Sequence, residues 1–89
     1  MKYSENCPAC GFALGFQAWD GGSASDEICP SCGIQFGYDD VAGGNQEGRR
    51  YLYVGWRLKW RKDGCRWSSK RPPPHNWNPE VQLERAMKI

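Results

Sequence analysis

The chain has 89 residues, 39% of them hydrophobic and five of them cysteine, with a net charge of +2. A chain this short holds one small domain, and such domains usually depend on disulfides, a metal ion or a partner for stability. The odd number of cysteines argues against a closed set of disulfides. No apolar run approaches the roughly 18 residues of a membrane span or forms a secretory signal. We therefore expect a single domain, residues 1–89, in a reducing cytoplasm.

The small net charge hides an uneven distribution along the chain. Residues 1–47 carry one basic and seven acidic side chains, a net of −6, whereas residues 48–89 carry eleven basic and three acidic ones, a net of +8. The two halves therefore offer surfaces of opposite sign, either to each other or to a partner.

Residues 6–40 form the cysteine-bearing segment, in which one five-residue pattern occurs twice. Cys7 and Cys10 flank Pro-Ala, Cys29 and Cys32 flank Pro-Ser, and a glycine follows each pair. Two Cys-x2-Cys pairs separated by 18 residues have the spacing of a four-thiolate zinc site. Two such turns complete a tetrahedron around one ion, with Zn–S distances of about 2.3 Å.

The pattern predicts one zinc ion on Cys7, Cys10, Cys29 and Cys32. Four protein ligands leave no open position for water or substrate, so the ion is expected to be structural and not catalytic. Iron suits the same sulfur cage, disulfides would need an oxidising compartment, and a redox-active Cys-x-x-Cys would need a thioredoxin-like βαβ pattern. Cys65 stands apart, as either a buried small side chain or an exposed thiol.

Short strands are predicted on either side of a loop. At residues 12–16 two Phe and one Leu alternate with smaller residues, and residues 34–38 alternate again. This alternation is typical of short antiparallel strands, and the composition of residues 20–25 indicates the loop between them.

A helical period begins after a break at residues 41–45. Leu52, Trp56 and Trp60 fall four residues apart, which predicts an amphipathic helix over residues 46–63 with these three side chains in the core. The apolar side is extended by Tyr51, Val54 and Leu58.

Residues 64–89 are predicted to form an extended proline segment and a short helix. Three consecutive prolines favour polyproline II. Asn78 before Pro79 is typical of a helix start, with Asn as the cap and Pro at the first helical position. A helix this short is only marginally stable by itself, so Leu83 and Met87 are expected to pack on the rest of the chain.

Together these elements predict a small α+β fold: a zinc ribbon of two Cys-Pro-x-Cys-Gly knuckles with short antiparallel strands, then a Trp-rich helix and a short C-terminal helix. Over residues 7–40, including Glu-Ile-Cys-Pro-Ser-Cys-Gly-Ile-Gln-Phe-Gly-Tyr-Asp-Asp at 27–40, the chain resembles the bacterial cysteine-rich CPCC-type proteins. These are small zinc-ribbon-like chains, several of which look like immunity proteins encoded beside polymorphic toxins. The resemblance is looser around Trp60, Trp67 and Trp77. It implies a ribbon fold, the bacterial cytoplasm and a protein partner.

Residues 49–71 combine nine basic side chains and one acidic one with three Trp and two Tyr. Basic groups neutralise phosphates while aromatic faces stack on bases. One interpretation of this stretch is therefore a nucleic-acid-binding surface. In the other interpretation the aromatic residues form part of the core. The basic residues then form a solvated face or pair with the acidic side chains of the first half. The basic residues concerned are Arg49, Arg50, Arg57, Arg61 and Lys62.

The sequence shows no Gly-rich phosphate loop, catalytic-triad spacing or carboxylate pair on a helix, and His75 is expected to be a loop residue. We therefore predict a non-enzymatic, cytoplasmic zinc-binding protein that acts by protein–protein interaction. Its most concrete form is an immunity protein that occludes a bacterial toxin domain, and the alternative is a nucleic-acid-binding zinc ribbon. The candidate partner-binding residues are Asp39, Asp40, Arg61 and Trp67, with turn capping as the ordinary role of the two aspartates.

Overall fold

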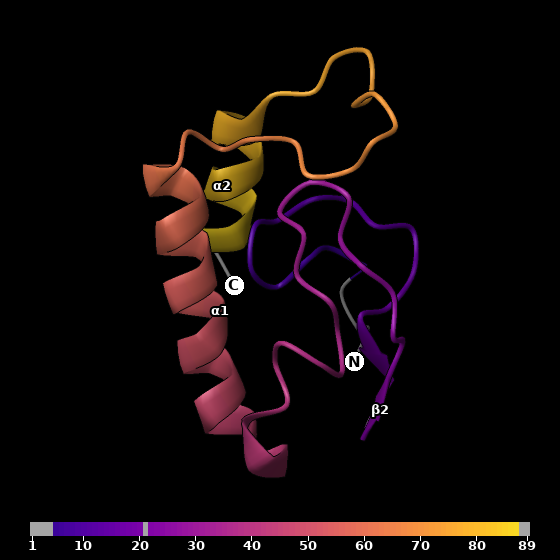
Figure 1. Ribbon diagram of the computed structural model, residues 1–89, viewed down its shortest axis with the longest axis vertical. Helices are drawn as coiled ribbons and strands as arrows, with labels where there is room; N and C mark the ends of the chain where they lie inside the picture. Colours follow the sequence, from indigo (N-terminus) through magenta and orange to yellow (C-terminus); the bar gives the residue numbers. More distant parts are fainter. Residues whose placement is uncertain (1–4, 21, 88–89) are drawn as a thin grey trace.

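The computed structural model describes residues 5–20 and 22–87, and Figure 1 shows their arrangement. In chain order the elements are β1 (Trp19–Asp20), β2 (Ser23–Ala24), the 3-10 helix η1 (Ala42–Gly44), α1 (Gln46–Lys62) and α2 (Pro79–Met87). The described part is therefore a small α+β structure, with a two-stranded antiparallel sheet and two α-helices.

The longest element, α1, stands on one side of the molecule and the cysteine-bearing segment on the other (Figure 1). With 17 residues, α1 is about 26 Å long at 1.5 Å per residue, in a molecule of 34 Å along its longest axis. The segment after α1 crosses over the end of the cysteine-bearing segment and leads into α2 (Figure 1). The buried core consists of the four cysteines of the repeated pattern together with Ala9, Ala18, Ile34, Phe36, Tyr53, Trp60 and Leu83.

The predicted strands are wrong in place and extent. Residues 12–16 and 34–38 each contribute one residue, Ala13 or Gln35, to an isolated antiparallel bridge. Within the described residues, regular pairing is confined to β1 and β2, which begin one residue before the predicted loop of residues 20–25 and pair Trp19 with Ala24. A glycine with positive φ turns the chain in both predicted strands before pairing can extend. These glycines are Gly15, with φ of 82°, and Gly37, with φ of 90°.

The helix predicted over residues 46–63 is present as α1. The side chain of Asn45 caps its start, because Oδ1 accepts hydrogen bonds from the amides of Glu47 at 2.9 Å and Gly48 at 3.4 Å. At the other end the amide of Asp63 donates to the carbonyl of Lys59 at 2.9 Å, after which the chain leaves the helix.

The buried face of α1 differs from the predicted one. Trp60 is buried and Trp56 is half-buried as expected, but Leu52 is 40% exposed and Tyr53 takes the core position at 8% exposure. Tyr53 lies three and seven positions before the two tryptophans, so the three side chains share one helix face. The residues expected to extend the apolar core instead lie on the outer face: Tyr51, Val54 and Leu58.

The short C-terminal helix is present as α2. Oδ1 of Asn78 accepts from the amides of Glu80 at 3.0 Å and Val81 at 3.3 Å, which is the predicted cap. Leu83 is buried, as expected, whereas the expected docking of Met87 concerns a side chain outside the described part.

Candidate metal centre

Each Cys-x2-Cys pair lies on a hydrogen-bonded turn. The amide of Gly11 donates to the carbonyl of Cys7 at 2.8 Å, and the amide of Gly33 donates to the carbonyl of Cys29 at 2.9 Å. In both turns the amide of the first cysteine donates to the carbonyl five residues further on, at 2.7 and 2.9 Å. The repeated pattern therefore produces two knuckles of the same backbone geometry, residues 7–11 and residues 29–33.

The two knuckles bring four sulfur atoms together. All four Sγ atoms lie within 4.8 Å of one another, with 3.8 Å between those of Cys7 and Cys32 and 3.7 Å between those of Cys10 and Cys29. A tetrahedron with Zn–S distances of about 2.3 Å has S–S edges of about 3.8 Å. The four cysteines are free of disulfides and close enough to hold a metal ion.

The four thiols are buried, which makes it costly to ionise them without a cation nearby. Cys7, Cys10 and Cys29 are fully buried, and Cys32 is 8% exposed. Burial raises the pKa of the Cys7 thiol, whereas hydrogen bonds, first from Cys29, lower the pKa of Cys10. Four thiolates at this depth require a cation between them. A soft, all-sulfur donor set suits zinc or iron.

Two arginines hold the first knuckle from outside. Arg57 of α1 donates from Nε to the carbonyl of Ala9 at 2.6 Å and from Nη2 to that of Pro8 at 2.9 Å. Arg85 of α2 donates from Nη1 to the carbonyl of Gly11 at 3.2 Å. A zinc ion with four thiolates carries a formal charge of about −2, so these two cations also offset the charge of a loaded site.

Neutral donors hold the second knuckle. The indole of Trp56 donates to the carbonyl of Cys32 at 3.1 Å. The amides of Ser68 and Ser69, in the segment after α1, donate to the carbonyl of Pro30 at 3.1 and 2.9 Å. The basic aromatic stretch therefore packs, in part, directly on the metal-binding turns.

Gln82 of α2 joins the second knuckle to the segment that precedes α2. This side chain is 3% exposed, donates to the hydroxyl of Ser31 at 2.8 Å and accepts from the indole of Trp77 at 2.7 Å. The prediction from sequence missed it, together with Arg57 and Arg85, because their partners are remote in the chain and no local pattern marks them.

Cys65 and His75, which the sequence pattern did not assign to the metal site, lie away from the four-cysteine cluster. Cys65 is half-buried, has a positive φ of 54° and lies outside the group of four thiols. Burial raises the pKa of the Cys65 thiol, so that less of it is thiolate at neutral pH than in an ordinary cysteine. His75 is exposed in the segment between the helices.

The two candidate aspartates have internal roles. Oδ2 of Asp39 accepts from the amide of Gln35 at 2.8 Å, which is the turn-capping role. Asp40 is fully buried, and its Oδ2 accepts from the indole of Trp19 at 2.8 Å and from the hydroxyl of Tyr53 at 2.5 Å. The prediction that Asp40 contacts a partner is wrong, because its carboxylate is enclosed by these donors.

The other two candidates differ in accessibility. Arg61 is exposed on α1 and stays a predicted partner-binding residue. The ring of Trp67 is half-buried between Phe12 and Trp77, with centroid distances of 5.3 and 5.0 Å and edge-to-face angles. Its indole donates to the carbonyl of Arg71 at 2.6 Å. The geometry gives Trp67 a packing role.

Comparison with family models, with curated proteins and with solved structures finds no match for this chain. Among the described helices, none combines the length and the apolar composition needed to cross a membrane. The functional argument therefore rests on the residues and their geometry.

Proposed function

We propose that the protein is a small zinc ribbon in which Cys7, Cys10, Cys29 and Cys32 hold one structural Zn²⁺ ion. The observation that carries this proposal is the sulfur geometry, since cross-knuckle distances of 3.7 and 3.8 Å match the edges of a zinc–thiolate tetrahedron. The depth of the cluster supports a structural role, because a buried ion with four protein ligands has no position for a substrate.

Elemental analysis of the purified protein tests the metal and its identity. We expect one zinc per chain, with iron at trace level, and five free thiols after denaturation in a chelator. A protein with well below one metal per chain and with its thiols paired as disulfides would contradict the zinc site. A stoichiometric iron content would support the four-thiolate site but would identify its ion as iron instead of zinc.

We further propose that the protein acts by binding another protein, as an immunity protein that occludes a toxin domain in the bacterial cytoplasm. The outer face of α1 supports a binding role, because Tyr51, Val54 and Leu58 are 80%, 46% and 59% exposed and lie at helical spacing. A row of exposed apolar side chains is typical of interaction sites, and Tyr and Arg are frequent energetic anchors in them. The resemblance of residues 7–40 supplies the class of partner.

Co-expression with the toxin domain encoded beside the gene tests this proposal. We expect protection of the cells and a one-to-one complex in calorimetry. The Tyr51→Ala variant is expected to weaken the complex by about 2 kcal/mol, a Kd increase of roughly 30-fold. Tyr38, which is 77% exposed in the cysteine-bearing segment, provides the matched Tyr38→Ala control with an unchanged Kd. Unprotected cells and no complex would contradict the immunity role.

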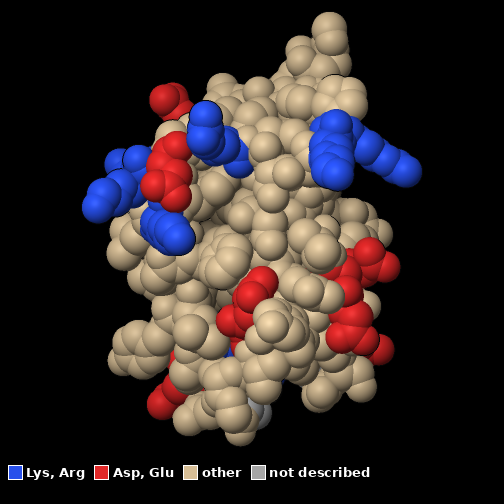
Figure 2. Space-filling model, viewed as in Figure 1, with Lys and Arg blue, Asp and Glu red and all other residues tan. Residues whose placement is uncertain are grey.

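Nucleic-acid binding is the second candidate, because the basic stretch keeps many of its charges at the surface. The exposed basic residues are Arg50, Lys59, Arg61, Lys62, Arg66, Lys70 and Arg71. On the face drawn in Figure 2, Lys and Arg gather in the upper half and most Asp and Glu in the lower half. Base stacking on tryptophan has less support, because all five tryptophans are half-buried or buried, which leaves Tyr51 as the exposed aromatic ring of the basic stretch.

Salt dependence separates the two candidates. A protein that neutralises phosphates on single strands loses affinity with a log–log slope of about −0.7 per phosphate. The double variant Arg61→Glu, Lys62→Glu would then flatten the slope. Sub-micromolar and steeply salt-dependent RNA binding, together with no protection against the neighbouring toxin, would favour the nucleic-acid candidate.

A further inference from the structure

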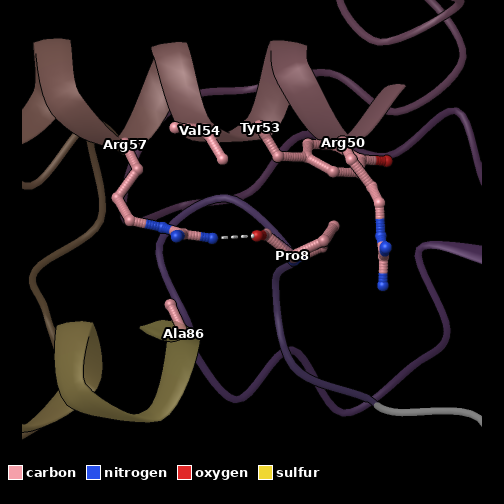
Figure 3. A pocket seen from close by; sticks show the side chains of 6 residues that line it. All are labelled: Pro8, Arg50, Tyr53, Val54, Arg57 and Ala86. Atoms are coloured by element: carbon pink, nitrogen blue, oxygen red, sulfur yellow. Dashed lines mark hydrogen bonds between the residues drawn. The ribbon is translucent and has the colours of Figure 1, made fainter. Parts of the chain in front are cut away.

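A groove lies beside the outer face of α1, next to the first knuckle and outside the cluster of four sulfur atoms. Figure 3 shows that α1, the first knuckle and α2 each contribute to its walls. Its volume is about 360 Å³. The lining residues are Pro8, Arg50, Tyr53, Val54, Arg57 and Ala86.

The groove is cationic at its edges and apolar between them. In the view of Figure 3, Pro8 lies between the side chains of Arg57 and Arg50. Arg57 uses Nε and one Nη2 N–H on the carbonyls of the knuckle, which leaves both Nη1 donors and one Nη2 donor available. Within the described residues, Arg50 is exposed and has no hydrogen bond or ion pair, and no acidic side chain lines the groove.

The surface continues across α1 into a second hollow of about 320 Å³. Glu47, Arg50, Tyr51 and Val54 line this hollow, so Arg50 and Val54 form a ridge between the two. A chain segment that crosses the ridge reaches the groove on one side and the exposed ring of Tyr51 on the other. The groove therefore adjoins the outer face of α1 through which we propose that the protein binds its partner.

We propose that this groove binds an acidic segment of the partner protein, with one carboxylate on Arg50, another on Arg57, and an aliphatic side chain between them on Pro8, Val54 and Ala86. Guanidinium groups bind carboxylates through strong, charge-assisted hydrogen bonds. The inference rests on the proposed protein-binding function and names the chemistry that the partner presents to it.

Charge and shape disfavour two other occupants. A second copy of this chain that docks through its own α1 would bring six basic side chains and one acidic one into contact with these arginines. A single-stranded nucleic acid would find cations for its phosphates, but the groove itself offers no free aromatic face, because the ring of Tyr53 is buried and the exposed ring of Tyr51 lies across the ridge.

Fluorescence anisotropy with the full zinc-loaded chain tests the groove. The probe is a labelled peptide of alternating Leu and Glu, compared with the same peptide carrying Gln in place of Glu. We expect the Glu peptide to bind at least about tenfold more tightly, and the Arg50→Glu variant to lose about tenfold in affinity. Val54→Gln is expected to lose about threefold. Lys62→Glu makes the same charge change elsewhere on α1 and is expected to change the affinity less than about twofold.

Zinc content and far-UV circular dichroism confirm that the variants are folded. Equal losses in the Arg50→Glu and Lys62→Glu proteins would overturn the groove in favour of unspecific attraction. Tighter, Arg50-dependent binding of an oligouridylate of equal charge would overturn the choice of an acidic protein segment. If the Arg50→Glu and Val54→Gln proteins protect cells against the neighbouring toxin as well as the wild type does, the proposed role of the groove is wrong while the immunity function stands.

Discussion

The two knuckles share a sequence pattern and a backbone geometry, yet the rest of the chain holds them in different ways. The first is held by the guanidinium groups of Arg57 and Arg85, which come from two different helices. The second is held by an indole and by backbone amides of an irregular segment. A repeated motif therefore predicts how a metal is bound, whereas unrelated residues elsewhere in the chain decide how each half of the site is supported.

Loss of the metal is expected to have the largest effect, because it removes both knuckles together. Apparent binding energies of structural zinc, about 10–16 kcal/mol, are as large as the whole net stability of a typical domain, about 5–15 kcal/mol. Chelation or Cys10→Ser is therefore expected to unfold at least residues 6–40, measured by circular dichroism and zinc content. Cys65→Ser is the matched control and keeps one zinc. A folded, zinc-loaded Cys10→Ser protein would contradict the four-thiolate site.

Substitution of the glycine at the end of each knuckle tests how closely the rest of the chain packs on that knuckle. Gly11 and Gly33 have φ of 86° and 82°, so a Cβ costs about 1–2 kcal/mol at either position. At Gly11 the Cβ would also overlap the backbone carbonyl oxygen of Gln82, whereas at Gly33 it would meet the hydroxyl of Ser68 at 2.6 Å. A side chain can rotate away and a helix backbone cannot.

We therefore expect Gly11→Ala to cost about 3 kcal/mol or more, and Gly33→Ala about 1–2 kcal/mol. Urea denaturation of the zinc-loaded proteins measures both free energies of unfolding. Equal costs would show that α2 does not pack on the first knuckle as closely as the structure indicates.

The arginine contact on the first knuckle is expected to have an intermediate effect. Arg57→Met keeps an unbranched, largely apolar side chain but leaves the carbonyls of Pro8 and Ala9 without their charged donor, at a cost of about 2 kcal/mol. Lys59→Met removes an exposed charge of the same helix and is expected to change stability by less than about 0.5 kcal/mol. Similar losses in both variants would assign the effect to the charge of α1 and not to the knuckle.

The smallest effect concerns Tyr53, which ties α1 to the turn that follows the second knuckle. Burial, and then the hydrogen bond to Asp40, raise the pKa of Tyr53 well above its ordinary value of about 10. Because the folded pKa is the higher one, this stabilisation is complete below about pH 10 and is lost as the pH rises above it. We expect Tyr53→Phe to cost about 1 kcal/mol at neutral pH.

Spectrophotometric titration at alkaline pH checks the same residue. Tyr53 is expected to ionise late, only as the protein unfolds. The late step should be missing in the Tyr53→Phe protein. Ionisation of Tyr53 near pH 10, with the native circular dichroism retained, would contradict the buried hydrogen bond.

The metal cluster and the helices could be predicted because their signals are local. Two Cys-x2-Cys pairs specify a four-thiol site whatever surrounds them, and Asn78 before Pro79 marks the start of α2 without reference to the rest of the chain. The strands could not be predicted in this way. The alternation at residues 12–16 and 34–38 is real, but one positive-φ glycine in each segment overrides it.

The buried face of α1 could not be predicted because apolar side chains occur on several of its sides. The choice between Leu52 and Tyr53 is made by tertiary contacts. Tyr53 meets the buried carboxylate of Asp40, and Arg57, one turn further on, meets the knuckle carbonyls. Asp40 was a candidate for partner binding because its charge gave no sign of the donors, Trp19 and Tyr53, that enclose it.

The long sequence separation of the knuckle contacts has a consequence for synthesis. Arg57 meets Ala9 across 48 positions, and Arg85 meets Gly11 across 74. All four cysteines leave the ribosome before α1 does, and contacts this distant in sequence form late. A nascent chain can therefore capture its ion while the knuckle carbonyls still face water. The loaded turns then serve as a template on which the later helices settle, so shortage of metal during translation would deprive both helices of their docking surface.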